Sequence, residues 1–340
     1  MPDRVLVTGI SGFLGGHVAL QLLAAGYTVR GSVRDLNKAQ KVRDILARHG
    51  ADVSRLEFVA LDLLADQGWP EAMEGIRYLQ HVASPFVISM PRDKADLIRP
   101  AVEGTQRALQ AAFASGVERV VLTSSMAAIM YGHPRDRTAP FVASDWTNLA
   151  GRDVTAYVES KTRAEQAAWE IAGKLGRAKD LAVINPGGIY GPLLDDDPGT
   201  SGMLIVRMLD GSIPAAPGIP LIIVDARDVA ALHVAAMTDP AAGGSRFPTG
   251  NGTYTLMDIA NMLRPTLPEY AGKLPRMAAP DWIVRILGFF DRDVRDNLGE
   301  LGVVKRTDAI EARALLGRPF IPAAEAVTAT ARSIVEHGLA

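Results

Sequence analysis

Short apolar, β-branched runs alternate with helix-like patterns along the first half of the chain. Several runs have the length and composition of buried strands, at residues 4–7, 28–33, 56–60, 78–82, 119–122 and 181–184. Apolar residues recur at helical spacing between them, most clearly at 13–25, 93–115 and 155–173. Alternation of strands with helices is typical of a parallel sheet covered by crossover helices. The pattern therefore predicts an α/β fold with a doubly wound parallel sheet.

The pattern changes after Asn185. The stretch at 185–192 is rich in glycine and proline, and Asp195-Asp196-Asp197 precede a further Pro-Gly pair, so we expect loops there. Beyond the loops we expect a strand at 221–224 and three helices. The first begins near Asp228, and the other two cover 256–263 and 322–337. We therefore expect a large first domain over residues 1–190. A smaller α/β part over 191–340 would follow, with some segments that return to the first domain.

Composition and charge exclude several classes of protein. The chain has 340 residues, of which 48% are hydrophobic and 22% charged, as in packed globular proteins. Its 36 basic residues nearly balance 38 acidic ones, so neither a nucleic acid nor an anionic membrane is an expected partner. The absence of cysteine excludes disulfides, thiolate metal ligands and cysteine nucleophiles. No secretory leader and no apolar stretch of about 20 residues is evident, so we expect a cytoplasmic protein.

A glycine-rich segment, Thr8-Gly9-Ile10-Ser11-Gly12-Phe13-Leu14-Gly15, lies between the first expected strand and the first expected helix. Glycines allow the backbone to approach a pyrophosphate, and the N–H groups and dipole at the start of a helix stabilise its charge. The simpler alternative is a tight strand-to-helix turn without a ligand. The strand–turn–helix context favours a dinucleotide site, which would include Gly9, Ser11, Gly12, Phe13, Leu14 and Gly15.

The residue that follows the second expected strand indicates which dinucleotide is bound. An acidic side chain there binds the ribose hydroxyls of NAD, whereas arginine pairs with the additional phosphate of NADP. This chain has Arg34 at that position, and Lys41 lies in the first turns of the next helix. An arginine fork and a lysine could together bind a phosphate. NADP(H) is therefore the expected cofactor; the alternative is that Asp35 binds a ribose and Arg34 is a solvated surface charge.

Tyr157 and Lys161 lie one helical turn apart and therefore on the same face of the expected helix. A cation near a phenol favours its ionised form, which eases proton transfer near neutral pH. The expected strand at 119–122 leads into Thr123-Ser124-Ser125, and ligands of open α/β sheets bind outside the carboxyl ends of strands. One of these hydroxyls could donate to a substrate carbonyl. Taken alone, the Tyr/Lys pair could be a surface pair and the hydroxyls part of a turn.

In combination, these motifs resemble the extended short-chain dehydrogenase/reductases. The resemblance is carried by the glycine turn, Asp62-Leu63, His81-Val82-Ala83-Ser84-Pro85, Thr123-Ser124-Ser125, Tyr157 with Lys161, and Asn185-Pro186. More narrowly, the chain looks like the branch of dihydroflavonol reductases, cinnamoyl-CoA reductases and methylglyoxal or aldehyde reductases. The resemblance covers nearly all of the first 230 residues and is loose beyond them.

The resemblance implies a Rossmann-type NADP-binding domain over 1–190 and a mainly substrate-binding part over 191–340. It further implies that Ser125 holds the substrate carbonyl, that Tyr157 is the general acid and that Lys161 binds the nicotinamide ribose and favours the phenolate. Arg34 and Lys41 would bind the 2′-phosphate. Further cofactor contacts would come from Asp62, Leu63, Val82, Ala83, Ser84, Thr123, Pro186, Gly187, Gly188, Ile189 and Ser201.

The segment after Ser125 departs from the plant flavonoid enzymes, because it lacks their polar, asparagine-containing stretch. The candidate substrate contacts are apolar or amphipathic, although each could equally belong to the core; they are Phe86, Met126, Tyr131, Tyr190 and Met203. They favour a lipophilic or aromatic aldehyde or ketone. No spacing of histidines and acids resembles a metal site, and the histidines are expected to be structural.

The predicted function is therefore an NADPH-dependent carbonyl reductase with a small-molecule substrate. One alternative is an NAD-dependent nucleotide-sugar epimerase or dehydratase, against which Arg34 argues. Another is a dinucleotide-sensing regulator without catalysis, which would have no need for Ser125, Tyr157 and Lys161. The resemblance also suggests a homodimer formed through the helices at 93–115 and 155–173.

Overall fold

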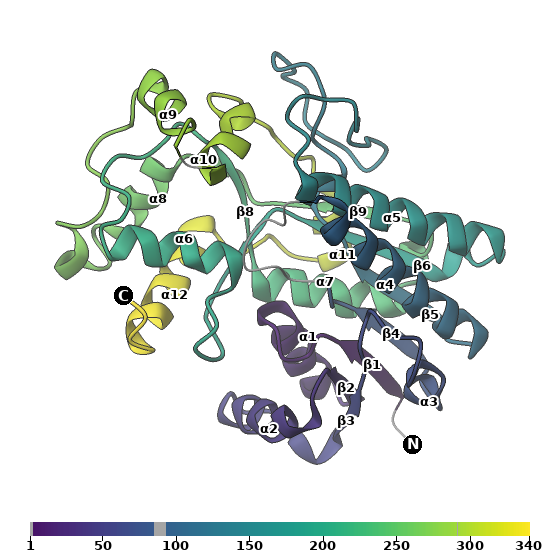
Figure 1. The fold of residues 1–340 in the computed structure, drawn as a ribbon. Coiled ribbons are helices and arrows are strands. Elements are labelled where there is room, and N and C mark those ends of the chain that lie inside the picture. The colour runs from purple at the N-terminus through teal and green to yellow at the C-terminus, as the bar shows by residue number, and fades with distance from the viewer. Residues whose placement is uncertain (1–2, 85–92, 291) are drawn as a thin grey trace.

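The computed structural model describes residues 3–84, 93–290 and 292–340. Its main sheet has seven strands in the order β3-β2-β1-β4-β5-β6-β9, and all neighbouring strands are parallel (Figure 1). The order reverses beside β1, as in doubly wound folds, and confirms the predicted Rossmann-type sheet. The strands are β1 (Arg4–Thr8), β2 (Thr28–Val33), β3 (Leu56–Ala60), β4 (Tyr78–His81), β5 (Arg119–Thr123), β6 (Leu181–Pro186) and β9 (Arg246–Thr249).

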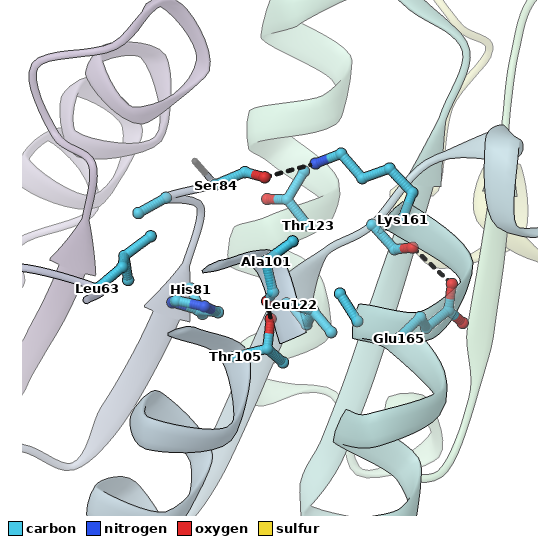
Figure 2. Close-up of a pocket in the computed structure, with 12 residues that line it drawn as sticks. Leu63, His81, Ser84, Ala101, Thr105, Leu122, Thr123, Lys161 and Glu165 are labelled. Atoms are coloured by element: carbon cyan, nitrogen blue, oxygen red, sulfur yellow. Dashed lines mark hydrogen bonds between the residues drawn. The ribbon is translucent and has the colours of Figure 1, made fainter. Parts of the chain in front are cut away.

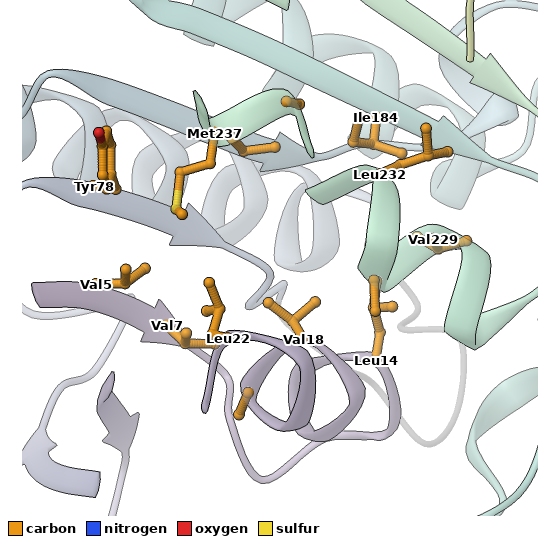
Figure 3. Close-up of a cluster of buried hydrophobic side chains, with 14 of the residues drawn as sticks. Val5, Val7, Leu14, Val18, Leu22, Tyr78, Ile184, Val229, Leu232 and Met237 are labelled. Atoms are coloured by element: carbon orange, nitrogen blue, oxygen red, sulfur yellow. The ribbon is translucent and has the colours of Figure 1, made fainter. Parts of the chain in front are cut away.

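One face of the main sheet packs against an apolar layer of helices (Figure 3). Alternate residues of a strand point to opposite faces, so Val5 and Val7 of β1 lie on this side, where they join Val18 and Leu22 in one fully buried cluster. The helices that contribute to the cluster are α1 (Phe13–Ala24), α2 (Ala39–Arg48), α7 (Ala226–Thr238) and α11 (Ile310–Leu316). Because α7 and α11 come late in the chain, its second half helps to complete the core of the first.

The opposite face is covered by α3 (Trp69–Met73), α4 (Ala95–Ala114) and α5 (Ala156–Lys174). Leu6 of β1 points to this side and belongs to a second buried cluster. Helix α5 begins after Thr155, whose hydroxyl accepts a hydrogen bond from the Val158 N–H at 3.3 Å. This side-chain cap fixes the start of the helix and thereby places Tyr157 in its first turn.

The remaining elements surround a separate apolar core, on the left in Figure 1. A three-stranded sheet has the order β10-β8-β7, with parallel β7–β8 and antiparallel β8–β10 pairs. Helices α6, α8 and α12 contribute most of the core's buried residues. The bounds are β7 (Gly188–Tyr190), β8 (Leu221–Asp225), β10 (Thr253–Tyr254), α6 (Gly199–Leu209), α8 (Leu256–Leu263), α9 (Asp281–Leu287), α10 (Arg292–Asp296) and α12 (Ala323–Glu336).

All strands expected from the hydrophobic pattern are present, with ends that shift by at most a few residues. The pattern did not predict helices α3, α6, α9, α10 and α11 or the short strands β7, β9 and β10. All of these except α6 have seven residues or fewer, and such short elements carry little periodicity. Strand β9 pairs with β6, so part of the segment after residue 190 lies in the main sheet. Among the described residues, no helix has both the length and the apolar character needed to cross a membrane.

Candidate active site

The turn between β1 and α1 brings backbone very close to backbone. Gly9 has a φ of +70°, and a Cβ atom there would lie 2.9 Å from the Ala83 Cα. At Gly15, a Cβ atom would lie only 2.1 Å from the Gly9 carbonyl oxygen. Gly12 precedes α1 and offers no side chain to cap it, so the first N–H groups of the helix are left for another acceptor. A pyrophosphate is such an acceptor, and the turn therefore fits a dinucleotide.

The side chains of the turn lie at different depths. Ser11 is exposed, Phe13 is half-buried, and Leu14 of α1 is buried in the apolar core between α1, the main sheet and α7. The start of α6 approaches the turn from the second part of the chain, because a Cβ atom at Gly199 would lie 3.8 Å from the Phe13 Cβ. The turn is thus bordered by segments from both parts of the chain.

Arg34 directly follows β2 and is exposed. It has no hydrogen-bond or ion-pair partner among residues 3–84, 93–290 and 292–340, so its guanidinium is available to a ligand. Asp35, the alternative ribose ligand, is engaged locally, because its carboxylate accepts a hydrogen bond from the Asn37 N–H at 2.9 Å. This arrangement favours Arg34 as the residue that meets the adenosine end of a cofactor.

Lys41, the second expected phosphate ligand, forms ion pairs with the loop that contains Asp195-Asp196-Asp197, here called the aspartate loop. Its Nζ lies 2.9 Å from Asp196 Oδ1 and 3.9 Å from Asp195 Oδ2. The hydrogen bond to Asp196 raises the pKa of Lys41, and the same contact lowers the pKa of Asp196. The aspartate loop therefore contacts α2. A phosphate bound by Lys41 would compete with these carboxylates for the ammonium group.

The ends of β3 and β4 supply the next group of expected cofactor contacts. Asp62 is exposed, and its carboxylate accepts a hydrogen bond from the Leu64 N–H at 2.9 Å, while Leu63 is half-buried. After β4, the Ala83 N–H donates to the Thr8 hydroxyl at 3.1 Å. This bond fastens the segment that contains Val82, Ala83 and Ser84 to the end of β1.

A small pocket lies at the carboxyl ends of β4 and β5, and Leu63, Ala83, Ser84, Thr123 and Lys161 are among the residues that line it. Figure 2 shows Ser84, Thr123 and Lys161 close together at one end of this pocket. The Lys161 Nζ donates to the Ser84 hydroxyl at 2.9 Å. The structure therefore brings together residues that the sequence placed on three separate elements.

Tyr157 and Lys161 share one face of α5, as expected, and Lys161 Nζ lies 5.9 Å from the centre of the Tyr157 ring. Tyr157 is 42% exposed, so part of its side chain is accessible from solvent. Ser125 follows β5 and is half-buried. Its oxygen accepts a hydrogen bond from the Ala127 N–H at 3.1 Å. Because that bond uses only a lone pair, the Ser125 O–H remains free to donate.

The segment at 186–201 leads from the end of β6 through β7 into α6. Gly187 lies against β8, since a Cβ atom there would be 2.6 Å from the Ile222 carbonyl oxygen. Gly188 and Ile189 belong to β7, which follows directly on β6 and Pro186. The Ser201 hydroxyl oxygen lies 3.7 Å from where a Cβ atom of Gly188 would be. Ser201 and the expected nicotinamide segment are therefore neighbours.

The candidate substrate residues separate into different environments. Met126 is 1% exposed and Tyr190 is 2% exposed, and both pack in apolar clusters. Tyr131 is half-buried beneath Lys305, whose Nζ lies 3.6 Å from the ring centre, and burial raises the pKa of Tyr131 well above its usual range. Met203 is 47% exposed on α6. Phe86 lies outside the described residues.

The model of the NAD dependent epimerase/dehydratase family matches residues 5–250. The chain belongs to this family. A ketoreductase of Aspergillus niger is 35% identical over 319 residues, which are 88% of this chain and 93% of that protein. A cinnamoyl-CoA reductase of Medicago truncatula is 34% identical over 284 residues, which are 82% of this chain and 84% of that protein.

Solved structures have the same fold over nearly the full length. Yeast methylglyoxal/isovaleraldehyde reductase complexed with NADPH has a TM-score of 0.80 and 24% identity, and the match covers 99% of this chain and 100% of that one. Gre2 from Candida albicans in complex with NADPH has a TM-score of 0.80 and 27% identity, over 99% of both chains. These matches confirm the family resemblance and the fold expected from the motifs.

This family member also contains a buried ionic network that the motifs did not reveal. Glu165 of α5 is fully buried, and its carboxylate accepts hydrogen bonds from the Ser124 hydroxyl at 2.5 Å, the Asn185 Nδ2 at 2.7 Å and the Arg246 Nε at 2.5 Å. Asn185 Nδ2 also lies 3.3 Å from the Ser125 carbonyl oxygen. The network therefore holds the segment that bears Ser125. Glu165 lies one helical turn after Lys161, and this spacing was the only signal in the sequence.

Arg246 extends the network to the loop before α5. Its Nη1 donates to the carbonyl oxygens of Ala143 and Asp145 at 2.7 and 2.6 Å. The guanidinium carbon lies 3.8 Å from the ring centre of Trp146. Arg246 and Glu165 thus connect β9 and α5 with the segment at 143–146, which precedes α5.

We expect Glu165→Gln to lower the free energy of unfolding by about 3–5 kcal/mol, because it leaves the buried Arg246 without a counter-ion. Denaturant titration measures this change. The matched control is Glu170→Gln on the same helix, whose pair with Lys174 is exposed on both sides, and there we expect less than about 1 kcal/mol. Equal effects in the two variants would contradict a stabilising role for the buried pair.

Proposed function

We propose that this chain is an NADPH-dependent reductase that converts the carbonyl of a lipophilic or aromatic aldehyde or ketone to the alcohol. The observation that carries the proposal is the 2.9 Å hydrogen bond from Lys161 to Ser84. It joins the helix of Tyr157 to the segment expected to bind the cofactor, so that a phenol, a cation and a dinucleotide site lie at one end of the sheet.

The similar proteins support the general class, an oxidoreductase that uses NADPH. They include a ketoreductase and a cinnamoyl-CoA reductase, and two of the similar solved structures are reductases complexed with NADPH. The exposed Arg34 supports NADP over NAD, because an arginine after the second strand can pair with the 2′-phosphate. It also argues against an NAD-dependent epimerase or dehydratase. The exposed Tyr157 argues against a regulator without catalysis, because proton transfer needs an accessible phenol.

In the proposed reaction, NADPH supplies a hydride when bound, and the protein supplies orientation and the proton. Ser125 accepts a hydrogen bond from the Ala127 N–H, so its own hydroxyl hydrogen is not used in that bond. This O–H would donate a hydrogen bond to the carbonyl oxygen of the substrate and stabilise the developing negative charge. Tyr157 would then transfer its phenolic proton to that oxygen. Lys161 lies beside the phenol and would stabilise the resulting phenolate.

The first experiment measures cofactor oxidation by absorbance, with NADPH and then NADH, against a panel of aromatic aldehydes, aliphatic ketones, diketones and dihydroflavonols. We expect turnover that prefers NADPH. No turnover with any carbonyl, together with tightly bound NAD in the purified protein, would overturn the proposal in favour of an epimerase or dehydratase.

We expect Tyr157→Phe to lower kcat by about 100-fold or more, because it removes the proton donor. NADPH binding, measured by cofactor fluorescence, should change little. The control is Tyr27→Phe, at a half-buried tyrosine before β2 that has no part in the site. A Tyr157→Phe variant that keeps most of its kcat would exclude Tyr157 as the general acid.

We expect Arg34→Ala to weaken NADPH binding by about 10- to 100-fold, because a charge-assisted phosphate contact is lost. NADH binding should be unchanged, since NADH lacks the 2′-phosphate. Arg48→Ala, which removes an exposed arginine at the far end of α2, is the control. An equal loss of NADPH and NADH affinity would show that Arg34 does not bind the 2′-phosphate.

A further inference from the structure

A chain of hydrogen bonds runs through the sheet beneath Thr123. Gln80 of β4 and His233 of α7 are both fully buried. Gln80 Nε2 donates to the His233 carbonyl oxygen at 3.0 Å, and Gln80 Oε1 lies 2.8 Å from His233 Nδ1. At the other side of the ring, His233 Nε2 lies 2.9 Å from the Thr123 hydroxyl oxygen.

The chemistry of these groups fixes the direction of every bond. A backbone carbonyl can only accept, so the amide nitrogen of Gln80 must face the His233 carbonyl. The amide oxygen then faces Nδ1, and because this oxygen also only accepts, Nδ1 must carry a hydrogen. The orientation of Gln80 therefore selects the Nδ1–H form of the His233 ring.

The ring is neutral in this environment. Burial alone lowers the pKa of His233 to about 3, and no carboxylate contributes an opposing effect. A neutral imidazole with hydrogen on Nδ1 has a bare Nε2, which can only accept. Thr123 must then donate its single hydroxyl hydrogen to His233, and the Thr123 oxygen keeps only lone pairs for other partners.

Thr123 is half-buried and lines the pocket beside Ser84 and Lys161 (Figure 2). Lys161 has hydrogens only to donate, whereas Thr123 has lone pairs only to accept. A ligand hydroxyl between these two side chains can bond to both, because its oxygen accepts a hydrogen bond from Lys161 and its hydrogen is donated to Thr123. A carbonyl or carboxylate oxygen has no hydrogen for Thr123.

We propose that His233 and Gln80 are positioning residues, which turn Thr123 into an acceptor-only site for a ribose hydroxyl of the bound dinucleotide. This inference rests on the proposed function, since it needs a cofactor in the pocket. It gives a function to a histidine that the sequence pattern places in a helix as a structural residue.

The ring form can be observed directly in the full-length protein. Two-bond nitrogen–hydrogen correlations in ¹⁵N-histidine-labelled protein distinguish the two neutral tautomers and the charged ring, and loss of one signal in His233→Leu assigns the resonance. We expect hydrogen on Nδ1 alone at neutral pH. Hydrogen on Nε2, or on both nitrogens, would overturn the proposal.

The second test compares NADPH binding by cofactor fluorescence in Thr123→Val, His233→Leu and the double variant. We expect about tenfold weaker binding in each single variant, because the oriented acceptor is lost in both cases. The double variant should bind no more weakly than either single variant, because the two residues act as one unit. Additive losses would contradict the coupling.

Thr123→Ser is the matched control, because it keeps the hydroxyl and should bind within about twofold of the wild type. If His233→Leu does not fold, as judged by thermal unfolding, His233→Gln is used in its place to assign the resonance. The tautomer measurement and the Thr123→Val and Thr123→Ser pair then decide the question. A wild-type protein that neither binds NADPH nor reduces carbonyls refutes the proposed function itself. A wild type that does both, with an unaffected Thr123→Val variant, refutes only the role of Thr123 and His233.

Discussion

The buried carboxylate of Glu165 is the constraint on which the architecture of the site depends. An ionised group with no exposure to water is tolerated only when charges and donors surround it. Ser124, Asn185 and Arg246 provide them: Ser124 directly follows β5, Asn185 lies near the end of β6 and Arg246 is the first residue of β9. Satisfying this one carboxylate therefore requires three strands and α5 to meet at a fixed geometry. Tyr157 and Lys161, on the same helix, are positioned as a consequence.

The hydroxyls that follow β5 illustrate how neighbouring groups give similar side chains different chemistry. Ser124 donates its hydroxyl hydrogen to the buried Glu165. Ser125 accepts from a backbone N–H, which leaves its own hydrogen for a substrate. Thr123 contacts His233 on the other side of the sheet, and in our proposal it offers only lone pairs. Three consecutive hydroxyl residues can thus serve as a structural donor, a donor to substrate and an acceptor.

The two parts of the chain are interleaved around the pocket. Helix α7 and strand β9 come after residue 190, yet they supply His233 and Arg246 to the first part. The aspartate loop reaches back to Lys41 of α2, and the start of α6 lies beside Phe13. Segments from the second part of the chain therefore border both α2 and the turn before α1.

Local sequence determined the strands of the main sheet other than β9, the glycine turn and the pairing of Tyr157 with Lys161 on one helix face. These features depend on periodicity and short spacing, which are visible in neighbouring residues. Tertiary structure alone decided the Glu165–Arg246 pair, 81 residues apart, the Thr123–His233 contact, 110 apart, and the Lys41–Asp196 pair, 155 apart. It also buried Met126 and Tyr190 in apolar clusters. Such contacts arise only when separate elements pack, and a single sequence carries no local signal for which distant partners will meet.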